Sequence, residues 1–185
     1  MKLRNFISGV LNGITATALI AVAATQLYAT ENSWSRKEIV RITHNDVYCL
    51  QQNIFFEARN QTVEGQVAVA WVTLNRLDND IYPDTICGVV KQAVLSKWHL
   101  EQGREVPVRN KCQFSWYCDG RSDDPTDMDA WAESRLVAYQ MIEGGLYRGI
   151  TEGATHYHAT YVEPSWRTRF SLVGHIGSHI FYRAE

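Results

Sequence analysis

The chain has 185 residues, of which 45% are hydrophobic and 21% are charged, so its composition is that of one globular domain and not of a long disordered chain. Eighteen Lys and Arg residues against twenty Asp and Glu residues give a net charge of −2, which leaves no basic excess for binding nucleic acid. The charges are uneven, because residues 3–29 contain one charged side chain whereas residues 30–185 carry sixteen basic and twenty acidic ones.

Residues 1–29 have the pattern of a signal peptide or a membrane anchor. A short cationic start precedes an uncharged stretch, 5–29, which exceeds the roughly 20 residues needed to cross a bilayer. Small residues dilute its hydrophobicity, as in a secretory signal cleaved near Leu27-Tyr28-Ala29, and an uncleaved anchor fits equally well. A buried helix of the globular domain is the alternative. We expect the rest of the chain to lie outside the cytoplasm.

The next segment, residues 30–45, is polar and charged and is expected to be a tether, so that the folded domain occupies 46–185. A first helix is predicted over 46–59, with Asp46 as its N-cap and Asn60 as its stop. Its apolar residues recur at helical spacing: Val47, Leu50, Ile54 and Ala58.

A second helix is predicted over 63–77, with Thr62 as N-cap and an apolar stripe formed by Val63, Val67, Ala70, Leu74 and Leu77. A turn follows at 82–84, and 85–95 is a shorter helical candidate. Residues 96–126 have no clear period and are interpreted as a long loop, a kind of segment that is usually functional.

A third helix is predicted over 127–143, ended by Gly144-Gly145, with Met128, Trp131, Leu136, Tyr139 and Ile142 as its apolar face. After this helix the residue pattern changes from helical spacing to one that favours strands, within 154–162, 170–173 and 179–183. The predicted architecture is a compact α+β domain with helices first and a small antiparallel sheet at the C-terminal end.

The four cysteines are even in number and allow three pairings. In an oxidising compartment, Cys112 and Cys118 can form a local bridge, which leaves Cys49 and Cys87 as the second pair. Buried free thiols are the alternative. The spacing does not match a zinc site, because there is no C-x-x-C motif.

Glu57 is the most informative single residue. It lies in the last turn of the first predicted helix, next to Ile54, Phe55 and Phe56. Burial and the negative end of the helix dipole both favour the neutral carboxyl and therefore raise its pKa. A carboxyl that stays protonated near neutral pH can act as the general acid in cleavage of a glycosidic bond. An ordinary carboxylate paired with a base is the alternative.

Five blocks of sequence form a specific pattern between about residues 47 and 183. They are Phe56-Glu57-Ala58-Arg59-Asn60-Gln61 with Glu64-Gly65-Gln66-Val67-Ala68-Val69-Ala70 and Leu74-Asn75-Arg76; Tyr82-Pro83-Asp84-Thr85-Ile86-Cys87; Cys112-Gln113-Phe114-Ser115-Trp116; Gly153-Ala154-Thr155-His156-Tyr157-His158-Ala159; and Ile176-Gly177-Ser178-His179-Ile180-Phe181-Tyr182. With these blocks in this order, the chain resembles the spore-cortex-lytic cell wall hydrolases of the SleB type.

The resemblance implies cleavage of peptidoglycan glycan strands and a compact fold related to lysozyme-like lytic transglycosylases. It places the catalytic glutamate at Glu57 and implies no metal and no cofactor. The expected location is the periplasm or the cell wall, with residues 5–29 as a contact to the inner membrane. Wall remodelling and lysis by a phage product (an endolysin) are equally compatible with the sequence.

Glu57 would protonate the glycosidic oxygen between N-acetylmuramic acid and N-acetylglucosamine. In a transglycosylase, the muramoyl 6-hydroxyl then attacks the anomeric carbon and one carboxyl group suffices. A two-carboxylate hydrolase needs a partner within about 5–10 Å, for which Glu64, Asp84 and Asp119 are candidates. No second acid is as well marked as Glu57, which favours the transglycosylase scheme.

The other blocks supply aromatic and polar groups that suit a sugar-binding groove. Aromatic rings stack on sugar faces, and amide, hydroxyl and imidazole groups bind acetamido and hydroxyl groups. The predicted substrate-binding residues are Gln113, Phe114, Ser115, Trp116, His156, Tyr157, His158 and Trp166. The alternative is structural, with Phe114 and Trp166 in the core and with Asn75 and Arg76 stabilising a turn.

Two rival functions remain open. His156 and His158 lie on one face of a predicted strand, about 7 Å apart, and with His175 or His179 they could bind zinc in an amidase that cuts the bond from muramic acid to the stem peptide. There is no H-E-x-x-H motif, which weakens this hypothesis. The other rival is a non-catalytic glycan-binding module, in which Glu57 only accepts a hydrogen bond from a sugar.

Overall fold

The computed structural model describes residues 43–184, so the predicted leader, 1–29, and nearly all of the predicted tether lie outside the described residues. The elements are α3 (His44–Ala58), α4 (Val63–Leu77), α5 (Ile86–Val90), β1 (Ala93–Leu95), α6 (Lys97–Leu100), β2 (Pro107–Cys112), the 3-10 turn η1 (Ser115–Cys118), α7 (Met128–Gly144), β3 (His156–Ala159), the 3-10 turn η2 (Ser165–Arg169), β4 (Ser171–Ile176) and β5 (His179–Arg183). The predicted α+β class is confirmed. Within 43–184, no helix has both the length and the apolar character that a membrane span requires.

Helix α3 begins at His44, two residues before the predicted start. Thr43 is the N-cap, and its hydroxyl accepts a hydrogen bond from the Asp46 N–H at 3.1 Å. The Asp46 carboxylate in turn accepts from the Thr43 N–H at 3.0 Å, which completes a capping box. The prediction of Asp46 as N-cap is therefore wrong, because this residue is at the third helical position, and residues 43–45 belong to the domain.

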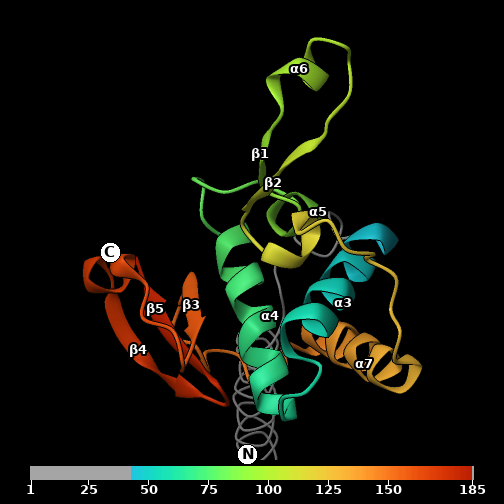
Figure 1. The fold of residues 1–185 in the computed structure, drawn as a ribbon. Helices are drawn as coiled ribbons and strands as arrows, with labels where there is room; N and C mark the ends of the chain where they lie inside the picture. The colour runs from blue at the N-terminus through green and yellow to red at the C-terminus, as the bar shows by residue number, and fades with distance from the viewer. Residues whose placement is uncertain (1–42, 185) are drawn as a thin grey trace, which may run out of the picture.

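Helix α4 has the predicted bounds, Val63–Leu77, and lies at the centre of the molecule. Figure 1 shows the three-stranded sheet on one side of α4 and helices α3 and α7 on the other. Because both sides are covered, most of the helix is buried, with apolar residues such as Val67, Val69 and Val72 fully so. The main core fills the space between α3, α4, α5 and α7.

Helix α7 confirms the predicted ends and corrects the predicted face. The Asp127 carboxylate caps the first turn, and Gly145 ends the helix in the left-handed conformation (φ 59°) that glycine tolerates best. Met128 and Leu136, both expected inside, are 63% and 57% exposed. The buried stripe consists of Ser134, Val137, Ala138, Met141 and Ile142. Of the predicted face, only Ile142 belongs to this stripe. The rest was missed because two of its members, Ser134 and Ala138, are small and give no strong apolar signal.

The C-terminal sheet is antiparallel, as the alternating sequence predicted, and its strand order is β3-β5-β4. The register of β3 and β5 runs from His156 opposite Tyr182 to Ala159 opposite His179. A second core cluster, formed by Ala68, Val72, Ala154 and Phe181, joins this sheet to α4. The sheet therefore holds β3 at a fixed position relative to the helical half.

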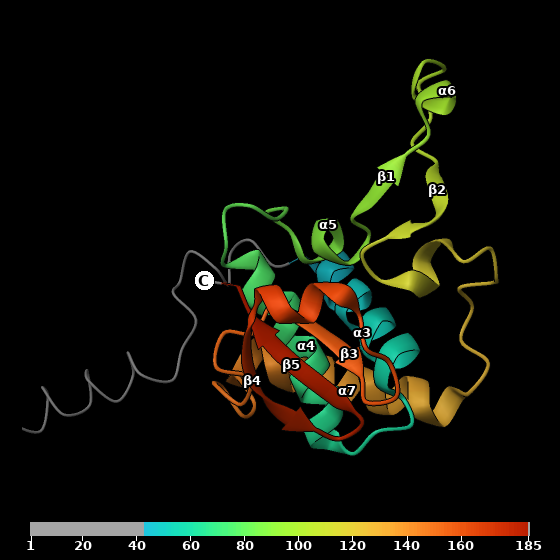
Figure 2. The same ribbon diagram turned by 60° about the vertical axis from the view of Figure 1, so that its left-hand side comes forward.

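Residues 85–126 differ most from the prediction. The expected helix over 85–95 is only five residues long, and its second half forms strand β1. The expected loop over 96–126 contains helix α6 and strand β2, which pairs antiparallel with β1. Residues 91–112, called the arm below, project from the rest of the molecule (Figures 1 and 2). Pairing between distant short strands leaves no periodic signal, which explains the error.

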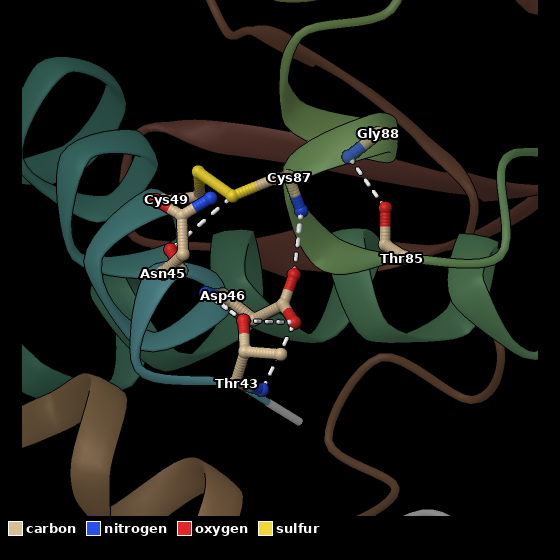
Figure 3. Close-up of a disulfide and its surroundings, with 7 residues drawn as sticks. All are labelled: Thr43, Asn45, Asp46, Cys49, Thr85, Cys87 and Gly88. Atoms are coloured by element: carbon tan, nitrogen blue, oxygen red, sulfur yellow. Dashed lines mark hydrogen bonds between the residues drawn. A yellow bond between two sulfur atoms is a disulfide. The ribbon is translucent and has the colours of Figure 1, made fainter. Parts of the chain in front are cut away.

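Both disulfides follow the pairing that the spacing suggested, and the free-thiol alternative is wrong. Cys49–Cys87 joins α3 to α5, and next to it the Cys87 N–H donates to the Asp46 carboxylate at 3.1 Å (Figure 3). Cys112–Cys118 joins the end of β2 to η1. The start of the described chain, α5 and the base of the arm are thereby fixed at one end of the molecule.

Candidate active site

A cleft of about 640 Å³ lies where the C-terminal end of α3, the segment 113–126 and strand β3 meet. Its lining is Phe56, Glu57, Arg59, Arg76, Gln113, Phe114, Ser115, Trp116, Asp119, Arg121, Ser122, Asp123, Asp124, Thr126, Tyr157, His158, Ala159, Tyr161, Val162 and His179. The predicted Glu57 and six of the eight predicted substrate-binding residues are among them. The segment that sequence analysis interpreted as a functional loop forms one wall.

Glu57 lies half-buried in the last turn of α3. Burial raises the pKa of its carboxyl above the ordinary value of 4.5, and this effect outweighs the opposing influence of Tyr157 and of the Arg76 charge. The raised pKa agrees in direction with the expectation from the sequence. A carboxyl in this environment keeps its proton at a higher pH than a surface glutamate does.

Tyr157 on β3 also lines the cleft and contacts Glu57 directly. Its hydroxyl donates a hydrogen bond to Glu57 Oε2 at 2.9 Å. Burial and the nearby Glu57 raise the pKa of the Tyr157 hydroxyl well above 10, so it remains a donor. Its ring packs against His179 and Phe181, with centroids 4.9 and 5.6 Å away. Tyr157 was predicted to bind sugar, and its contact with Glu57 was not foreseen.

Arg76 on α4 is a buried cation near Glu57. The structural alternative from the sequence was that it stabilises a turn. Its Nε donates to the Thr155 carbonyl at 2.8 Å, and its guanidinium lies 5.1 Å from the ring centroid of Phe114. When the Gln113 side-chain oxygen faces it, that oxygen accepts from both terminal nitrogens at 3.1 and 3.2 Å. Burial lowers the pKa of Arg76, and nearby Tyr157, Tyr82 and Glu57 oppose this. Arg76 thereby connects α4, β3 and the 113–114 segment.

Phe114 and Trp116 line the cleft and also belong to the core, with exposures of 3% and 8%. Trp116 stacks on Phe56 with ring centroids 4.7 Å apart, and its indole N–H donates to the Asn53 side-chain oxygen at 3.1 Å. The two aromatic residues therefore combine the predicted groove role with the structural alternative. Gln113 and Ser115, which alternate with these two rings along the chain, are exposed.

His156 and His158 share one face of β3, as predicted, and the Trp166 ring lies beside both, at 5.6 and 5.7 Å. Only His158 lines the cleft; its Nδ1–H donates to the Ala159 carbonyl at 2.9 Å and its Nε2 accepts from the Tyr182 hydroxyl at 3.1 Å. His156 stacks on Phe170 at 4.1 Å, and burial lowers its pKa to about 4. His156 and Trp166 are not brought into the cleft.

The zinc hypothesis receives no support from the arrangement of side chains. Among residues 43–184, no three His, Cys, Asp or Glu side chains are grouped closely enough to hold a metal ion. His175 is exposed on β4, whereas His179 on β5 lines the cleft. Burial and His158 lower the pKa of His179, and within the described chain its Nδ1 is buried without a hydrogen-bond partner.

Of the three candidates for a second carboxylate, the structure places one in the cleft. Asp119 lines the cleft, and its carboxylate accepts from the Arg121 N–H at 2.8 Å. Glu64 and Asp84 are exposed and do not line the cleft. Sequence analysis missed Asp123 and Asp124, which line the same cleft; partial burial and the two neighbouring carboxylates raise the pKa of Asp123.

A family of known proteins matches about two thirds of the chain. The sequence profile of the family described as Cell Wall Hydrolase matches residues 60–182. The match begins three residues after Glu57 and includes the cleft residues from Arg76 to His179.

Two spore cortex-lytic enzymes are similar over a shorter stretch. That of Oceanobacillus iheyensis is 46% identical over 48 residues, which are 26% of this chain and 17% of the relative. That of Bacillus subtilis is 44% identical over 48 residues, which are 26% of this chain and 16% of the relative. The aligned part is thus less than a fifth of the length of either relative.

Two solved structures are similar in fold at low sequence identity. The catalytic domain of the germination-specific lytic transglycosylase SleB from Bacillus anthracis is 22% identical, with a TM-score of 0.47 over 77% of this chain and 97% of that one. The catalytic domain of the Bacillus cereus SleB protein is 21% identical, with a TM-score of 0.46 over 82% of this chain and 100% of that one.

Proposed function

The chain belongs to the cell wall hydrolase family, and from that premise we propose that it cleaves the glycan strand of peptidoglycan with Glu57 as general acid and base. The bond is the one that joins N-acetylmuramic acid to N-acetylglucosamine. One observation carries the proposal: a half-buried carboxyl with a raised pKa opens into the 640 Å³ cleft and is held by a tyrosine hydroxyl.

The first step is protonation of the glycosidic oxygen. The Tyr157 hydroxyl donates to Glu57 Oε2, so the proton of the neutral carboxyl is available on Oε1. Transfer of this proton accompanies breakage of the bond from the muramoyl anomeric carbon to oxygen, and the N-acetylglucosamine unit leaves with a free hydroxyl. Glu57 is then an anion, which Tyr157 and the nearby Arg76 charge stabilise.

The second step closes an internal ring. The muramoyl 6-hydroxyl attacks the anomeric carbon, and its proton returns to Glu57, so no water is consumed and the product carries an anhydro end. This scheme needs one carboxyl group. A muramidase would instead need a second acid to activate water, and two of the three candidates, Glu64 and Asp84, do not line the cleft. Asp119 does line it, and its carboxylate accepts from the Arg121 N–H at 2.8 Å.

We propose that the remaining lining binds the glycan. Gln113 and Ser115 present exposed polar groups beside the buried rings of Phe114 and Trp116. His179 also lines the cleft, where its ring packs against that of Tyr157 with centroids 4.9 Å apart. His156 and Trp166 lie outside the cleft and contribute through the aromatic cluster that supports His158.

A glycan-cleaving role requires that the domain reach the wall. We propose that residues 1–29 bring it there, as a cleaved signal or as an inner-membrane anchor, for wall remodelling or lysis. Fractionation of cells that express the full chain tests this, because the protein should be found in the periplasmic or membrane fraction and be lost from both when 1–29 are deleted.

The catalytic role is tested with Glu57→Gln on purified peptidoglycan. The amide keeps the size of the carboxyl and can still accept from Tyr157, but it cannot supply a proton. We expect release of soluble muropeptides to fall by roughly 10²–10⁴-fold. Glu64→Gln is the matched control, because Glu64 is an exposed carboxylate outside the cleft, and it should retain full activity.

Other outcomes would identify the rival functions. Activity that survives Glu57→Gln but is lost with a chelator would support the amidase. Binding of the wild-type chain to peptidoglycan without any product would support the non-catalytic module. Either result would contradict the proposed role of Glu57.

A further inference from the structure

The arm, residues 91–112, exposes apolar side chains that the fold has left without cover. Trp98 and Leu100 in α6 are 60% and 44% exposed, and Val94 and Val108 in the strands are 59% and 37% exposed. The arm lies away from both core clusters (Figures 1 and 2). Exposed tryptophan and leucine at the end of a projecting segment are typical of a surface that contacts a partner.

The conformation of the tip is fixed by local contacts. The Ser96 N–H donates to the Val106 carbonyl at 2.8 Å, which closes the base of the tip. The Trp98 ring is held between His99, with ring centroids 4.6 Å apart, and the Arg104 guanidinium, 5.6 Å from its centroid. Trp98 is therefore displayed in a defined position next to a cation.

The charge of the arm is opposite to that of the domain. Residues 91–112 carry five basic and two acidic side chains, whereas the other described residues carry eight basic and fifteen acidic ones. The basic side chains are Lys91, Lys97, Arg104, Arg109 and Lys111. An anionic surface attracts the cationic arm and repels the anionic remainder of the domain, so the molecule approaches such a surface with the arm facing it.

The chain enters the domain at the same end. Forty-two residues precede Thr43, and Asp46 and Cys49 of the first helix are joined to Cys87 by a hydrogen bond and a disulfide (Figure 3). The arm begins directly after α5, the helix that contains Cys87. A leader that reaches a membrane would therefore bring this end of the domain toward that membrane.

We propose that the arm docks on the anionic phospholipid surface of a membrane. Trp98 and Leu100 enter the headgroup region, and Lys97 and Arg104 pair with lipid phosphates beside them. The segment that follows the arm, Gln113 to Trp116, lines the cleft. Docking thereby holds the cleft at a set height above the membrane. The proposal concerns a surface outside the cleft and does not depend on the chemistry of Glu57.

The test uses the full chain with all six tryptophans replaced by 5-fluorotryptophan. The ¹⁹F signal of Trp98 is assigned by its loss in Trp98→Phe. Nanodiscs of phosphatidylcholine alone, or with about a third phosphatidylglycerol, carry a gadolinium-chelating lipid as a broadening probe. We expect selective broadening of the Trp98 signal on the anionic discs, no selective broadening on the neutral ones, and an unaffected Trp166 signal.

Charge reversal makes the test specific. Lys97→Glu/Arg104→Glu should raise the disc concentration needed to broaden the Trp98 signal by at least about thirtyfold, because two surface cations are replaced by anions. Arg135→Glu/Arg148→Glu changes the net charge equally on another face and should have little effect. Both double variants should release muropeptides from soluble glycan chains at the wild-type rate, which separates this proposal from the catalytic one.

Two results would overturn the proposal. Equal broadening of Trp98 and Trp166 on anionic discs would show that the arm makes no specific contact. A Trp98 signal that responds to soluble glycan fragments but not to anionic discs would assign the arm to the substrate instead.

Discussion

Removal of the Tyr157 hydroxyl should shift the pH dependence of cleavage upward. The hydroxyl donates to Glu57 Oε2 at 2.9 Å and favours the ionised carboxyl, so it lowers the pKa of Glu57 against the larger effect of burial. Tyr157→Phe removes this influence and leaves the ring that packs on His179 and Phe181. The pKa of Glu57 should therefore rise further.

The size of the shift follows from the two forms of the carboxyl. A hydrogen bond to a charged group contributes about 1.5–3 kcal/mol and one to a neutral group about 1 kcal/mol. The difference, about 0.5–2 kcal/mol, corresponds to roughly one pKa unit. A general acid acts in its protonated form, so the alkaline limb of the rate profile should move up by about one pH unit.

The assay is the pH profile of kcat/KM on soluble glycan chains for the wild type, Tyr157→Phe and the control Tyr139→Phe. Tyr139 lies on α7 and does not line the cleft, so its profile should match that of the wild type. An unchanged or downward-shifted alkaline limb in Tyr157→Phe would refute the reasoning, even if the rate itself fell.

Three further predictions concern stability. Glu57→Gln should raise the melting temperature at pH 8 and leave it unchanged near pH 4. Because burial raises the pKa of Glu57, the folded protein loses stability as pH rises through that pKa, and the neutral amide avoids this loss. Replacing Cys49 and Cys87 by Ser should lower the free energy of unfolding by about 4 kcal/mol, and replacing Cys112 and Cys118 should lower it by about 2 kcal/mol, because the closed loops span 38 and 6 residues. Urea titration measures both losses, and equal losses would contradict the prediction. His156→Gln should reduce the stability that the protein loses between pH 6.5 and pH 4. The pKa of His156 in the folded protein is lowered from 6.5 to about 4, so the unfolded chain takes up the proton first as pH falls. Identical melting temperatures of variant and wild type over this range would argue against it.

The parts of the fold that local patterns encode were predicted well. Helix 63–77 and strand 179–183 have the predicted bounds, because capping residues and regular periodicity are properties of neighbouring residues. The disulfides followed from a short spacing and from elimination. The small residues on the buried face of α7 and the strands of the arm have no such local signal, and both were missed.

In the candidate site, too, local features were predicted and long-range contacts were not. The position of Glu57 at a helix end among apolar neighbours indicated a raised pKa, and its direction is confirmed. Its partner Tyr157 is 100 residues away, and the buried cation of Arg76 connects to β3 through Thr155, 79 residues away. Such contacts arise only when the sheet packs on α4, so sequence reasoning found the residue types in the cleft but not their connections.

Mass spectrometry of the products released from purified peptidoglycan tests the central claim most directly. A single general acid and base at Glu57 predicts glycan fragments with anhydro-muramic ends, each one water lighter than a hydrolysis product, and their disappearance with Glu57→Gln. Free stem peptides, or reducing-end fragments that persist in Glu57→Gln, would contradict it.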